Sequence, residues 1–461
     1  MISVHCWVAA FAMFALTFDS GYFIERQQFT HLIFTYSLLF ATYLFILKKT
    51  DSETDARFWF IFAFLLRGSL TFSFPNLSDD IYRFVWDGRL IHLGVNPFDF
   101  KPSYFVENQL FSSDLTPELY QKLNSKNYFT VYPSVCQALF AFATWLFPKS
   151  LYGAAIVIKI FLTACDFGTL FLMKKMLKSY KKTLIYALNP LIIIELCGNA
   201  HFEAAMIFFF LLSIFLLKKI KINPNFEGFK NAKILSLSAL FFALSVASKM
   251  LSFLFLPFLT KKMGWKKSIF YFGMVGGILL LFFLPLYNDL FINNIQSSLN
   301  LYFEKFEFNA SLYYLLREVS EFVYGFNFIS RIAVVLRIIL LLSLALIFFF
   351  DLKNKNENEG FANFFEKCLF ALSVYFLCAT TVHPWYASML LALSVFTQFR
   401  YPAAWTYFIF LTYIHYSYPK PTENFWVIAL EYSTVIAFAL WEISKKKKKE
   451  KSEQFVQNTP N

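Results

Sequence analysis

Apolar runs recur along almost the whole of this chain, and many approach the length that crosses a lipid bilayer. A helix needs about 17–25 largely apolar residues to cross roughly 30 Å of hydrocarbon. Of the 461 residues 58% are hydrophobic and 16% are charged, whereas soluble domains carry about 25% charged residues. We therefore expect an all-α polytopic integral membrane protein that leaves no large soluble domain over.

About fourteen apolar segments are predicted to span the membrane. Several of them are short, notably 250–260 and 386–398, so we expect them to be tilted, broken or completed by neighbouring residues. The predicted spans cover residues 4–18, 31–47, 58–75, 151–173, 183–198, 203–217, 234–248, 250–260, 268–286, 331–350, 368–382, 386–398, 403–417 and 425–443.

Lysines gather in short clusters between the apolar runs. A net charge of +12 would suit nucleic acid, but short basic loops of membrane proteins stay on the cytoplasmic side, so we expect no nucleic-acid partner. With the N-terminus inside, the alternation predicts residues 1–444 as a transmembrane domain and 445–461 as a basic, disordered cytoplasmic tail. The inside loops are 174–182, 218–233, 261–267 and 351–367, and the outside loops are 19–30, 76–150, 287–330 and 418–424.

The segment from Ser134 to Phe147 is apolar enough to span the membrane. A crossing there would put the basic run KKMLKSYKK outside, which the distribution of lysines disfavours. We therefore expect a juxtamembrane helix that lies at the outer interface, inside the large extracytoplasmic loop 76–150.

The most unusual stretch is SDDIYRFVWDGRLIHLGVNPF, residues 78–98, which begins just beyond the third span. In a helix that starts at Ser78, the side chains of Asp79, Arg83 and Asp87 fall on one face. Asp87-Gly88 and Asn96-Pro97 are turn signals. Taken alone, the stretch is explained by acids that cap a helix and by an arginine in ion pairs.

Four other polar clusters, far apart in the sequence, fall on the same side of the membrane in this topology. A lone histidine or lysine at a helix end is usually structural or snorkels to the interface. Five coincident clusters beside hydrocarbon indicate a function, because ionisable groups there are costly. The four are Asn199, His201 and Glu203 in GNAHFE, Lys249 between two apolar runs, Asn309, Tyr313 and Arg317 in FNASLYYLLR, and His383, Trp385 and Tyr386 in HPWY.

These residue types suit the recognition of a phosphate at headgroup depth beside a carboxylate. Asp79 or Asp80 could act as a general base toward an acceptor hydroxyl, and charge-assisted hydrogen bonds to phosphate are strong. The candidates for binding the donor phosphate and sugar are Arg83, Arg89, Asn199, His201, Glu203, Lys249, His383, Trp385 and Tyr386. The candidates for binding the acceptor are Trp86, Asp87 and Asn96.

The motifs resemble those of the GT-C superfamily of membrane glycosyltransferases, and most of all bacterial polyprenyl-phosphate-mannose-dependent mannosyltransferases. The matching stretches are residues 78–98, NPLIIIELCGNAHFEAAM at 189–206, FNASLYYLLR at 308–317 and HPWYASMLL at 383–391. The resemblance implies a site on the extracytoplasmic face of the cytoplasmic membrane, an acidic base in the first large outer loop, and inversion at the anomeric carbon. It leaves the choice between Asp79 and Asp80 open, and we prefer Asp79. Several relatives carry an aspartate where this chain has Glu203.

The resemblance also implies the substrates, namely a polyprenyl-phosphate-linked hexose, with mannose preferred, and a hydroxyl on a glycolipid, glycan or protein. Some GT-C enzymes need a divalent metal such as magnesium or manganese and others do not, and no ligand spacing here decides. A lipid or oligosaccharide flippase or transporter is the alternative, but transporters generally bind at the bilayer midplane between repeats, and no repeat is evident. A non-catalytic sensor or assembly factor is a third class, against which the intact Asp79 and Asp80 argue.

Overall fold

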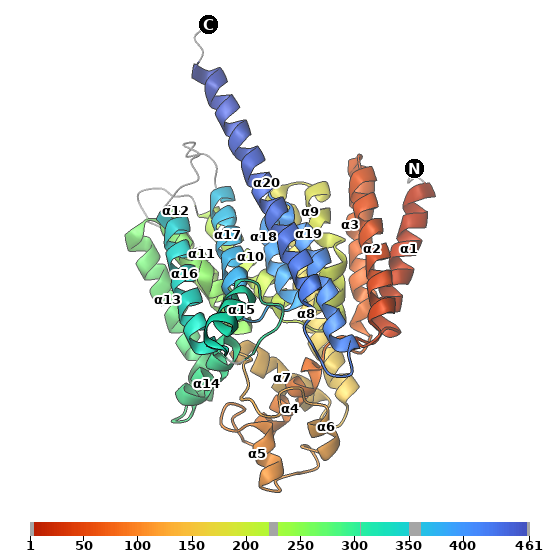
Figure 1. Cartoon of the computed structure of the whole chain (residues 1–461), viewed down its shortest axis with the longest axis vertical. Coiled ribbons are helices and arrows are strands. Elements are labelled where there is room, and N and C mark those ends of the chain that lie inside the picture. The colour runs from red at the N-terminus through yellow and green to blue at the C-terminus, as the bar shows by residue number, and fades with distance from the viewer. Residues whose placement is uncertain (1–3, 221–228, 305, 350–360, 459–461) are drawn as a thin grey trace.

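The computed structural model describes residues 4–220, 229–304, 306–349 and 361–458. Within these ranges every regular element is a helix, and the one β-type contact is a parallel bridge between Phe308 and Thr381. Long helices run side by side through the body of the molecule, and a smaller helical unit lies at one end of them (Figure 1). The expected all-helical architecture is confirmed.

The first half of the chain supplies the smaller unit and the helices that hold it. Three long helices precede the unit, α1 (Val4–Tyr22), α2 (Phe29–Lys49) and α3 (Glu53–Thr71). The unit itself contains α4 (Asp80–His92), α5 (Pro102–Glu107), α6 (Pro117–Gln121) and α7 (Ser134–Leu146). The chain then returns through α8 (Leu151–Leu177), α9 (Tyr180–Ala187), the π-helix η1 (Ile192–Gly198), α10 (Glu203–Lys219) and α11 (Phe229–Ser248).

Short irregular helices are frequent in the second half. Four of its helices are of the 3-10 type, η2 (Met250–Leu259), η3 (Leu284–Leu286), η4 (Pro384–Tyr386) and η5 (Ile409–Ser417). The α-helices are α12 (Thr260–Met263), α13 (Trp265–Phe283), α14 (Phe291–Glu304), α15 (Leu312–Tyr324), α16 (Ile329–Phe349), α17 (Ala362–Cys378), α18 (Ala387–Ser394), α19 (Tyr401–Phe408) and α20 (Phe425–Asn458).

Helices occupy all fourteen segments that the sequence predicts as spans, but they are not fourteen long helices. By length and apolar composition, seven described helices could cross a membrane, or eight if η1 and α10, which are bent by 105°, form one span. Other predicted spans consist of two short helices in series, such as α19 and η5. The count of about fourteen crossings therefore stays a prediction.

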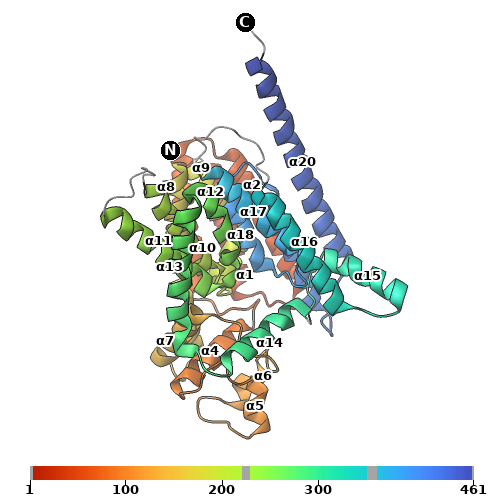
Figure 2. The ribbon, with the colours of Figure 1, turned by 90° about the vertical axis from the view of Figure 1, so that its left-hand side faces the viewer.

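The two ends of the molecule differ in the elements they carry. The start of α1, helices α9 and α12, and the C-terminal part of α20 lie at one end, and α4 to α7 lie at the other (Figures 1 and 2). The lysine clusters 174–182 and 261–267 adjoin α9 and α12, so both lie opposite the unit of α4 to α7. The predicted inside loops 218–233 and 351–367 fall largely outside the described residues. Which end faces the cytoplasm stays a prediction.

Helix α20 continues past the membrane-length segment. The sequence predicts a disordered tail from residue 445, yet the helix runs to Asn458. Lysine and glutamate are good helix formers, and Lys446 forms ion pairs with Glu366 at 2.5 Å and with Glu450 one turn on at 4.0 Å. These interactions explain how a basic segment with few apolar residues prolongs the helix.

Buried ionisable side chains tie α3 to α8. The Arg67 Nε atom lies 2.5 Å from Asp166 Oδ2, and both side chains are fully buried. The Lys159 ammonium donates to the carbonyl oxygens of Leu70 and Ser73 at 2.6 and 2.5 Å, at the end of α3. Because an unpaired charge in hydrocarbon is costly, these bonds fix the point at which the chain leaves α3 toward α4.

We predict that the two ends of the molecule lie on opposite sides of the cytoplasmic membrane. In a Cys6→Ser background the remaining native cysteines are buried, so a cysteine at Gln121 should react with an impermeant maleimide while the membrane is intact. Cysteines at Lys182 and Lys266 should react only after permeabilisation. Labelling at Lys182 from outside would contradict the topology and the interfacial placement of residues 134–147.

Candidate functional site

The segment between α3 and α4 is anchored to the membrane helices before it reaches its two carboxylates. The backbone N–H of Leu77 donates to Asn199 Oδ1 at 3.1 Å. Asn199 in turn donates to Glu195 Oε2 at 3.3 Å, and the Tyr413 hydroxyl donates to Glu195 Oε1 at 2.8 Å. The Glu195 side chain is fully buried. The GNAHFE turn therefore sets where residues 77–80 leave the long helices.

Asp79 and Asp80 stand at the start of α4 and have different partners. Asp79 precedes the helix, makes no capping bond with its side chain, and forms an ion pair with Arg26 from the turn between α1 and α2. The Arg26 guanidinium also lies 4.6 Å from the centre of the Tyr416 ring. Asp80 Oδ1 accepts a bond from Asn124 Nδ2 at 3.1 Å. One carboxylate is thus neutralised by an arginine, and the other receives a neutral hydrogen bond.

The GNAHFE and HPWY motifs meet through their aromatic rings. The ring of Trp385 stacks between two histidines, with centroid distances of 3.8 Å to His201 and 4.5 Å to His383 and interplanar angles of 14° and 10°. The His201 Nε2 atom lies 3.3 Å from a Glu195 carboxylate oxygen without hydrogen-bond geometry. Ala200 adopts a φ of 62°, which lets the chain turn sharply from η1 into α10.

Lys249 joins the same cluster from the end of α11. Its ammonium forms an ion pair with Glu203 and lies 4.8 Å from the centre of the Tyr386 ring. Glu203 is buried, and its second oxygen has no hydrogen-bond partner within the described structure. The structure therefore brings together three of the sequence motifs around the basic group of Lys249, and Asn199 connects them to the segment that carries Asp79.

The FNASLYYLLR motif contacts the segment that carries HPWY. The Phe308 N–H donates to the Thr380 carbonyl at 3.0 Å, the Val382 N–H donates to the Phe308 carbonyl at 2.9 Å, and the Phe308 ring lies 4.7 Å from that of His383. Asn309 donates to the Val382 carbonyl and to Glu431 at 3.3 Å. Tyr313 and Arg317 bond instead to Glu307. The motif thus holds HPWY in place.

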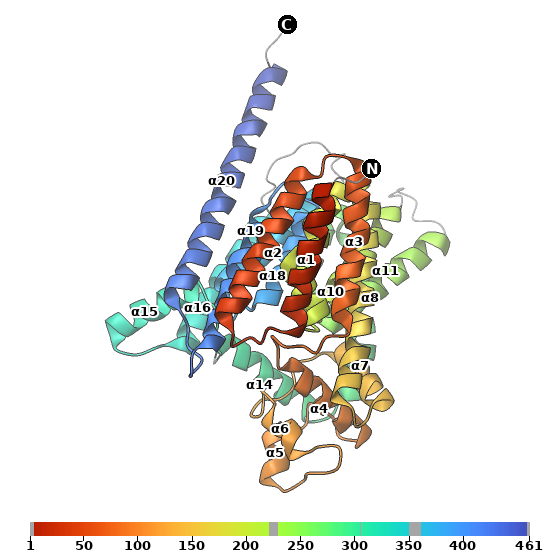
Figure 3. The same cartoon turned by 90° about the vertical axis from the view of Figure 1, so that its right-hand side faces the viewer.

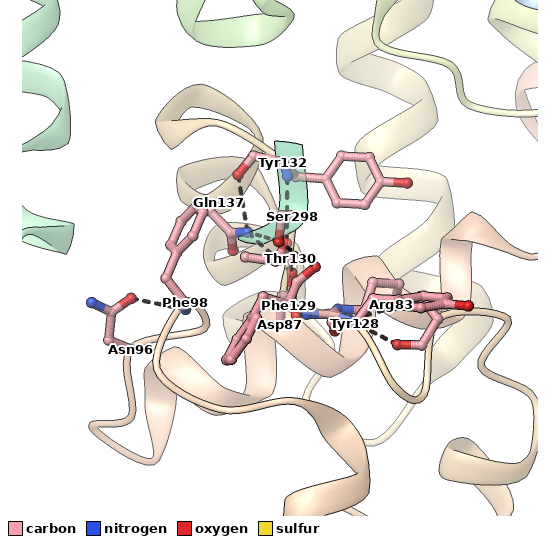
Figure 4. Close-up of polar contacts among 11 residues, drawn as sticks. Arg83, Asp87, Asn96, Phe98, Tyr128, Phe129, Thr130, Tyr132, Gln137 and Ser298 are labelled. Atoms are coloured by element: carbon pink, nitrogen blue, oxygen red, sulfur yellow. Dashed lines mark hydrogen bonds and ion pairs between the residues drawn. The ribbon is translucent and has the colours of Figure 1, made fainter. Parts of the chain in front are cut away.

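The remaining predicted residues of the 78–98 motif lie inside the unit of α4 to α7. Arg83 Nε and Asp87 Oδ1 form a buried ion pair at 2.7 Å, and Asp87 also accepts bonds from Thr130 at 2.6 Å and Gln137 at 3.1 Å (Figure 4). Arg83 donates further to the Tyr128 carbonyl at 2.9 Å. These contacts leave Arg83 and Asp87 committed to internal packing.

Trp86, Arg89 and Asn96 are likewise engaged within the fold. The indole of Trp86 is fully buried against the Phe105 ring, 5.8 Å away. Arg89 donates to the Asp114 carbonyl at 2.7 Å, and Asn96 donates to the Leu286 carbonyl at 2.7 Å. The structure does not bring these three side chains into the cluster around Lys249.

We predict that the Arg83–Asp87 pair stabilises the protein. Breaking a buried ion pair from one side costs about 3–5 kcal/mol because it leaves an unpaired buried charge, so Asp87→Asn should lower the thermal midpoint of the purified protein markedly. The matched control is Asp51→Asn, which breaks the exposed pair with Lys181 and should have little effect. Equal midpoints for both variants would contradict the assignment.

Arg26, Tyr416 and Glu195 were not singled out from the sequence. Arg26 carries a usable signal, because it is an arginine in a predicted outside loop, where basic residues are disfavoured. Glu195 carries another, since an ionisable residue within a predicted span is rarely present without a partner. Tyr416 carries none, because tyrosines are common near membrane interfaces.

Burial sets the protonation of the two stacked histidines. It lowers the pKa of His383 to about 3 and that of His201 to about 4, in the second case against the opposing influence of Glu203 and Asp80. Both imidazoles are therefore neutral near pH 7, and each can donate one hydrogen bond through a ring N–H.

These lowered pKa values predict a loss of stability at mildly acidic pH. Below about 6.5 the unfolded chain binds protons at both histidines while the folded protein does not, so the free energy of unfolding falls by at most roughly 1.4 kcal/mol per pH unit for each histidine. The double variant His201→Phe and His383→Phe keeps aromatic rings beside Trp385 and removes both titrating groups.

The thermal midpoint of the double variant should therefore fall less between pH 7 and pH 5 than that of the wild type, as measured in detergent. His5→Phe, which removes an exposed histidine, should retain the wild-type dependence. An unchanged pH dependence in the double variant would show that other groups are responsible.

No group of three or more His, Cys, Asp or Glu side chains placed to hold a metal ion occurs among the described residues. The Asp79 carboxylate is instead paired with Arg26. The described geometry thus offers no ready-made set of protein ligands for the divalent metal considered from the sequence.

Comparison with known proteins adds a family to this geometry. The family described as alpha-(1->6)-mannopyranosyltransferase, N-terminal domain (MptA_B family) matches residues 23–264, more than half of the chain. The chain belongs to this family. The match includes Arg26, Asp79, Asp80 and Lys249 and ends before HPWY. No curated protein and no solved structure matches the chain.

Membership shows that the protein is a glycosyltransferase of a mannosyltransferase family. The resemblance seen in the sequence motifs to membrane mannosyltransferases is thereby confirmed, and the apolar helices agree with a membrane protein. The flippase or transporter alternative has no support from the comparison.

Proposed function

We propose that this protein is a GT-C enzyme that moves a mannosyl residue from a polyprenyl-phosphate donor to a hydroxyl acceptor on the extracytoplasmic face of the cytoplasmic membrane. The observation that carries the proposal is the connection through Asn199. This residue accepts a bond from Leu77, two residues before Asp79, and belongs to the turn that also carries His201. Asn199 therefore links the segment that carries the carboxylate pair to the turn that belongs to the basic, aromatic cluster.

Lys249 provides the charge for the donor phosphate. Its ammonium has three donors, so it can keep its bond to Glu203 and still donate to a phosphate oxygen. Neutral His201 and His383 add ring N–H donors, and Trp385, stacked between them, holds both imidazole rings in place. A polyprenyl tail in the bilayer would bring its phosphate to this depth, so that the membrane itself supplies proximity.

The acidic pair provides the base. A hydroxyl is a poor nucleophile at neutral pH, and a carboxylate within hydrogen-bond reach can take its proton as the bond to the anomeric carbon forms. The bond between that carbon and the phosphate oxygen breaks, and the phosphate leaves with the electron pair. We favour Asp79, whose carboxylate is held in place by the ion pair with Arg26.

The family description supports the nature of the product. An α-(1->6) linkage, as in the family's description, requires that the accepting hydroxyl be the one on carbon 6 of the acceptor residue. If the reaction inverts the anomeric carbon, an α product requires a β-linked mannosyl phosphate. We therefore propose a β-mannosyl polyprenyl phosphate as donor and a glycan or glycolipid with a free carbon-6 hydroxyl as acceptor.

The test is transfer of radiolabelled mannose from a polyprenyl phosphate to a membrane extract by the purified protein. Asp79→Asn keeps the shape of the side chain and removes the base, so turnover should fall by about 10²-fold or more while protein abundance and donor binding persist. Asp289→Asn, an exposed site in another predicted outside loop, is the matched control and should retain activity.

The neighbouring carboxylate decides the assignment. If Asp80→Asn abolishes transfer and Asp79→Asn does not, Asp80 is the base. Near-normal turnover in both variants would remove the acidic motif from the chemistry. Absence of transfer by the wild-type protein from any mannosyl donor would contradict the proposed function itself.

A further inference from the structure

Helix α15 carries an apolar stripe that is exposed in the described structure. The stripe consists of Leu315, Val319, Phe322 and Val323, which are all exposed, and Phe322 is 92% exposed. Apolar residues at successive spacings of four, three and one positions lie on one side of an α-helix. The helix therefore presents a continuous apolar surface to its surroundings.

The other side of α15 is polar and holds the helix to the rest of the molecule. Arg317 forms ion pairs with Glu307 at 2.8 Å and with Glu318 at 3.0 Å, and it lies 3.7 Å from Glu321. The Tyr313 side chain is buried and donates to Glu307. The carboxylates of Glu318 and Glu321 stay exposed. The helix is thus amphipathic, with its charges outside the apolar stripe.

The helix lies where two apolar helices start. Gly325, with a φ of 78°, ends α15 in the left-handed conformation, and α16 begins soon after, at Ile329. The Tyr314 ring contacts the ring of Phe425, the first residue of α20, with centroids 5.3 Å apart. Figure 3 shows α15 projecting sideways near the ends at which α16 and α20 start.

Both of these neighbouring helices are long and apolar enough to cross a membrane. Most of the apolar segment of α16 is not buried by protein, so a bilayer would surround it. The Arg331 guanidinium, near the start of α16, lies 4.6 Å from the centre of the Phe328 ring. Aromatic residues gather at membrane surfaces, and the charged ends of long basic side chains reach the headgroups there. The surface of a bilayer crossed by α16 and α20 would therefore lie at the level of α15.

We propose that α15 is an interfacial helix whose apolar stripe binds the acyl chains of the leaflet on the side of α4 to α7. Amphipathic helices of this kind lie in the plane of the membrane surface, with the apolar face about 5–10 Å deep at the boundary between headgroups and acyl chains. Arg317, Glu318 and Glu321 then lie toward the headgroups and water. The assignment goes beyond the transfer reaction and does not depend on it.

A second copy of the chain is the other occupant that an exposed apolar stripe could have. The position of α15 favours lipid, because the stripe stands at the start of two membrane-length helices and hydrocarbon is already present at that level. The helix is also connected to HPWY, since Glu307 precedes Phe308, whose backbone pairs with residues 380 and 382. The depth of α15 in the leaflet would thus bear on the position of that motif.

The test places a bimane fluorophore on one side of α15 or the other in the full-length protein. Val319→Cys puts it on the apolar stripe. Glu321→Cys, an exposed position two residues on and across the helix, is the matched control. In a Cys6→Ser background the remaining native cysteines are buried. Each labelled variant is reconstituted at one copy per nanodisc in phosphatidylethanolamine and phosphatidylglycerol.

Lipids brominated near the headgroup end of their acyl chains should quench the label at position 319 strongly. Aqueous iodide should quench it several-fold less than it quenches the label at position 321, because the stripe is expected below the headgroups. The label at position 321 should show the opposite preference. Phe322→Cys supplies a second label on the stripe if Val319→Cys does not assemble.

Two results would overturn the proposal. Equal quenching by iodide at both positions would show that the stripe lies in water. Absence of quenching by brominated lipid at position 319, with protection from iodide only in nanodiscs that hold two copies, would show that a second copy covers the stripe.

Discussion

Asn199 is the residue on which the arrangement of the site depends. Its side chain accepts from the Leu77 backbone and donates to Glu195, so it links the outer segment to a helix buried among the long helices. In hydrocarbon an unsatisfied polar group is expensive, which makes each of these bonds hard to replace. The long helices therefore determine the position of the carboxylate pair. The smaller unit of α4 to α7 is stabilised separately by the Arg83–Asp87 ion pair.

Irregular helices occur where the chain turns at the candidate site. The π-helix η1 ends one residue before Asn199, and the 3-10 helix η4 contains Trp385 and Tyr386. Such segments are common at functional sites, and at membrane depth they persist only where protein surrounds them or a cavity is lined. Here Glu195 bonds to the Tyr413 hydroxyl of η5, and Trp385 is enclosed by two imidazoles. The bends thus bring side chains from helices that are far apart in the sequence into contact with one another.

The sequence predicted the helical class, the meeting of GNAHFE, HPWY and Lys249, and the end of the molecule at which they meet. Hydropathy is strong enough to reveal the helices, and polar residues beside apolar runs indicate where the candidate site lies. Trp86, Arg89 and Asn96 lie outside the cluster around Lys249, because α4 and the residues after it pack inside the smaller unit or against Leu286, and their binding roles stay predictions. Arg26 could not be joined to Asp79 without the structure, since the two are 53 residues apart and only packing makes them neighbours.

The pairing of Arg26 with Asp79 has a consequence for the proposed transfer. The guanidinium contacts one of the two carboxylate oxygens, and 30% of the Asp79 side chain remains exposed. Because a guanidinium presents its N–H groups in a rigid plane, the contact fixes the direction of the carboxylate. The proposed base would therefore take its orientation from the turn between α1 and α2, so that a movement of these two helices would change the alignment of the carboxylate with a substrate.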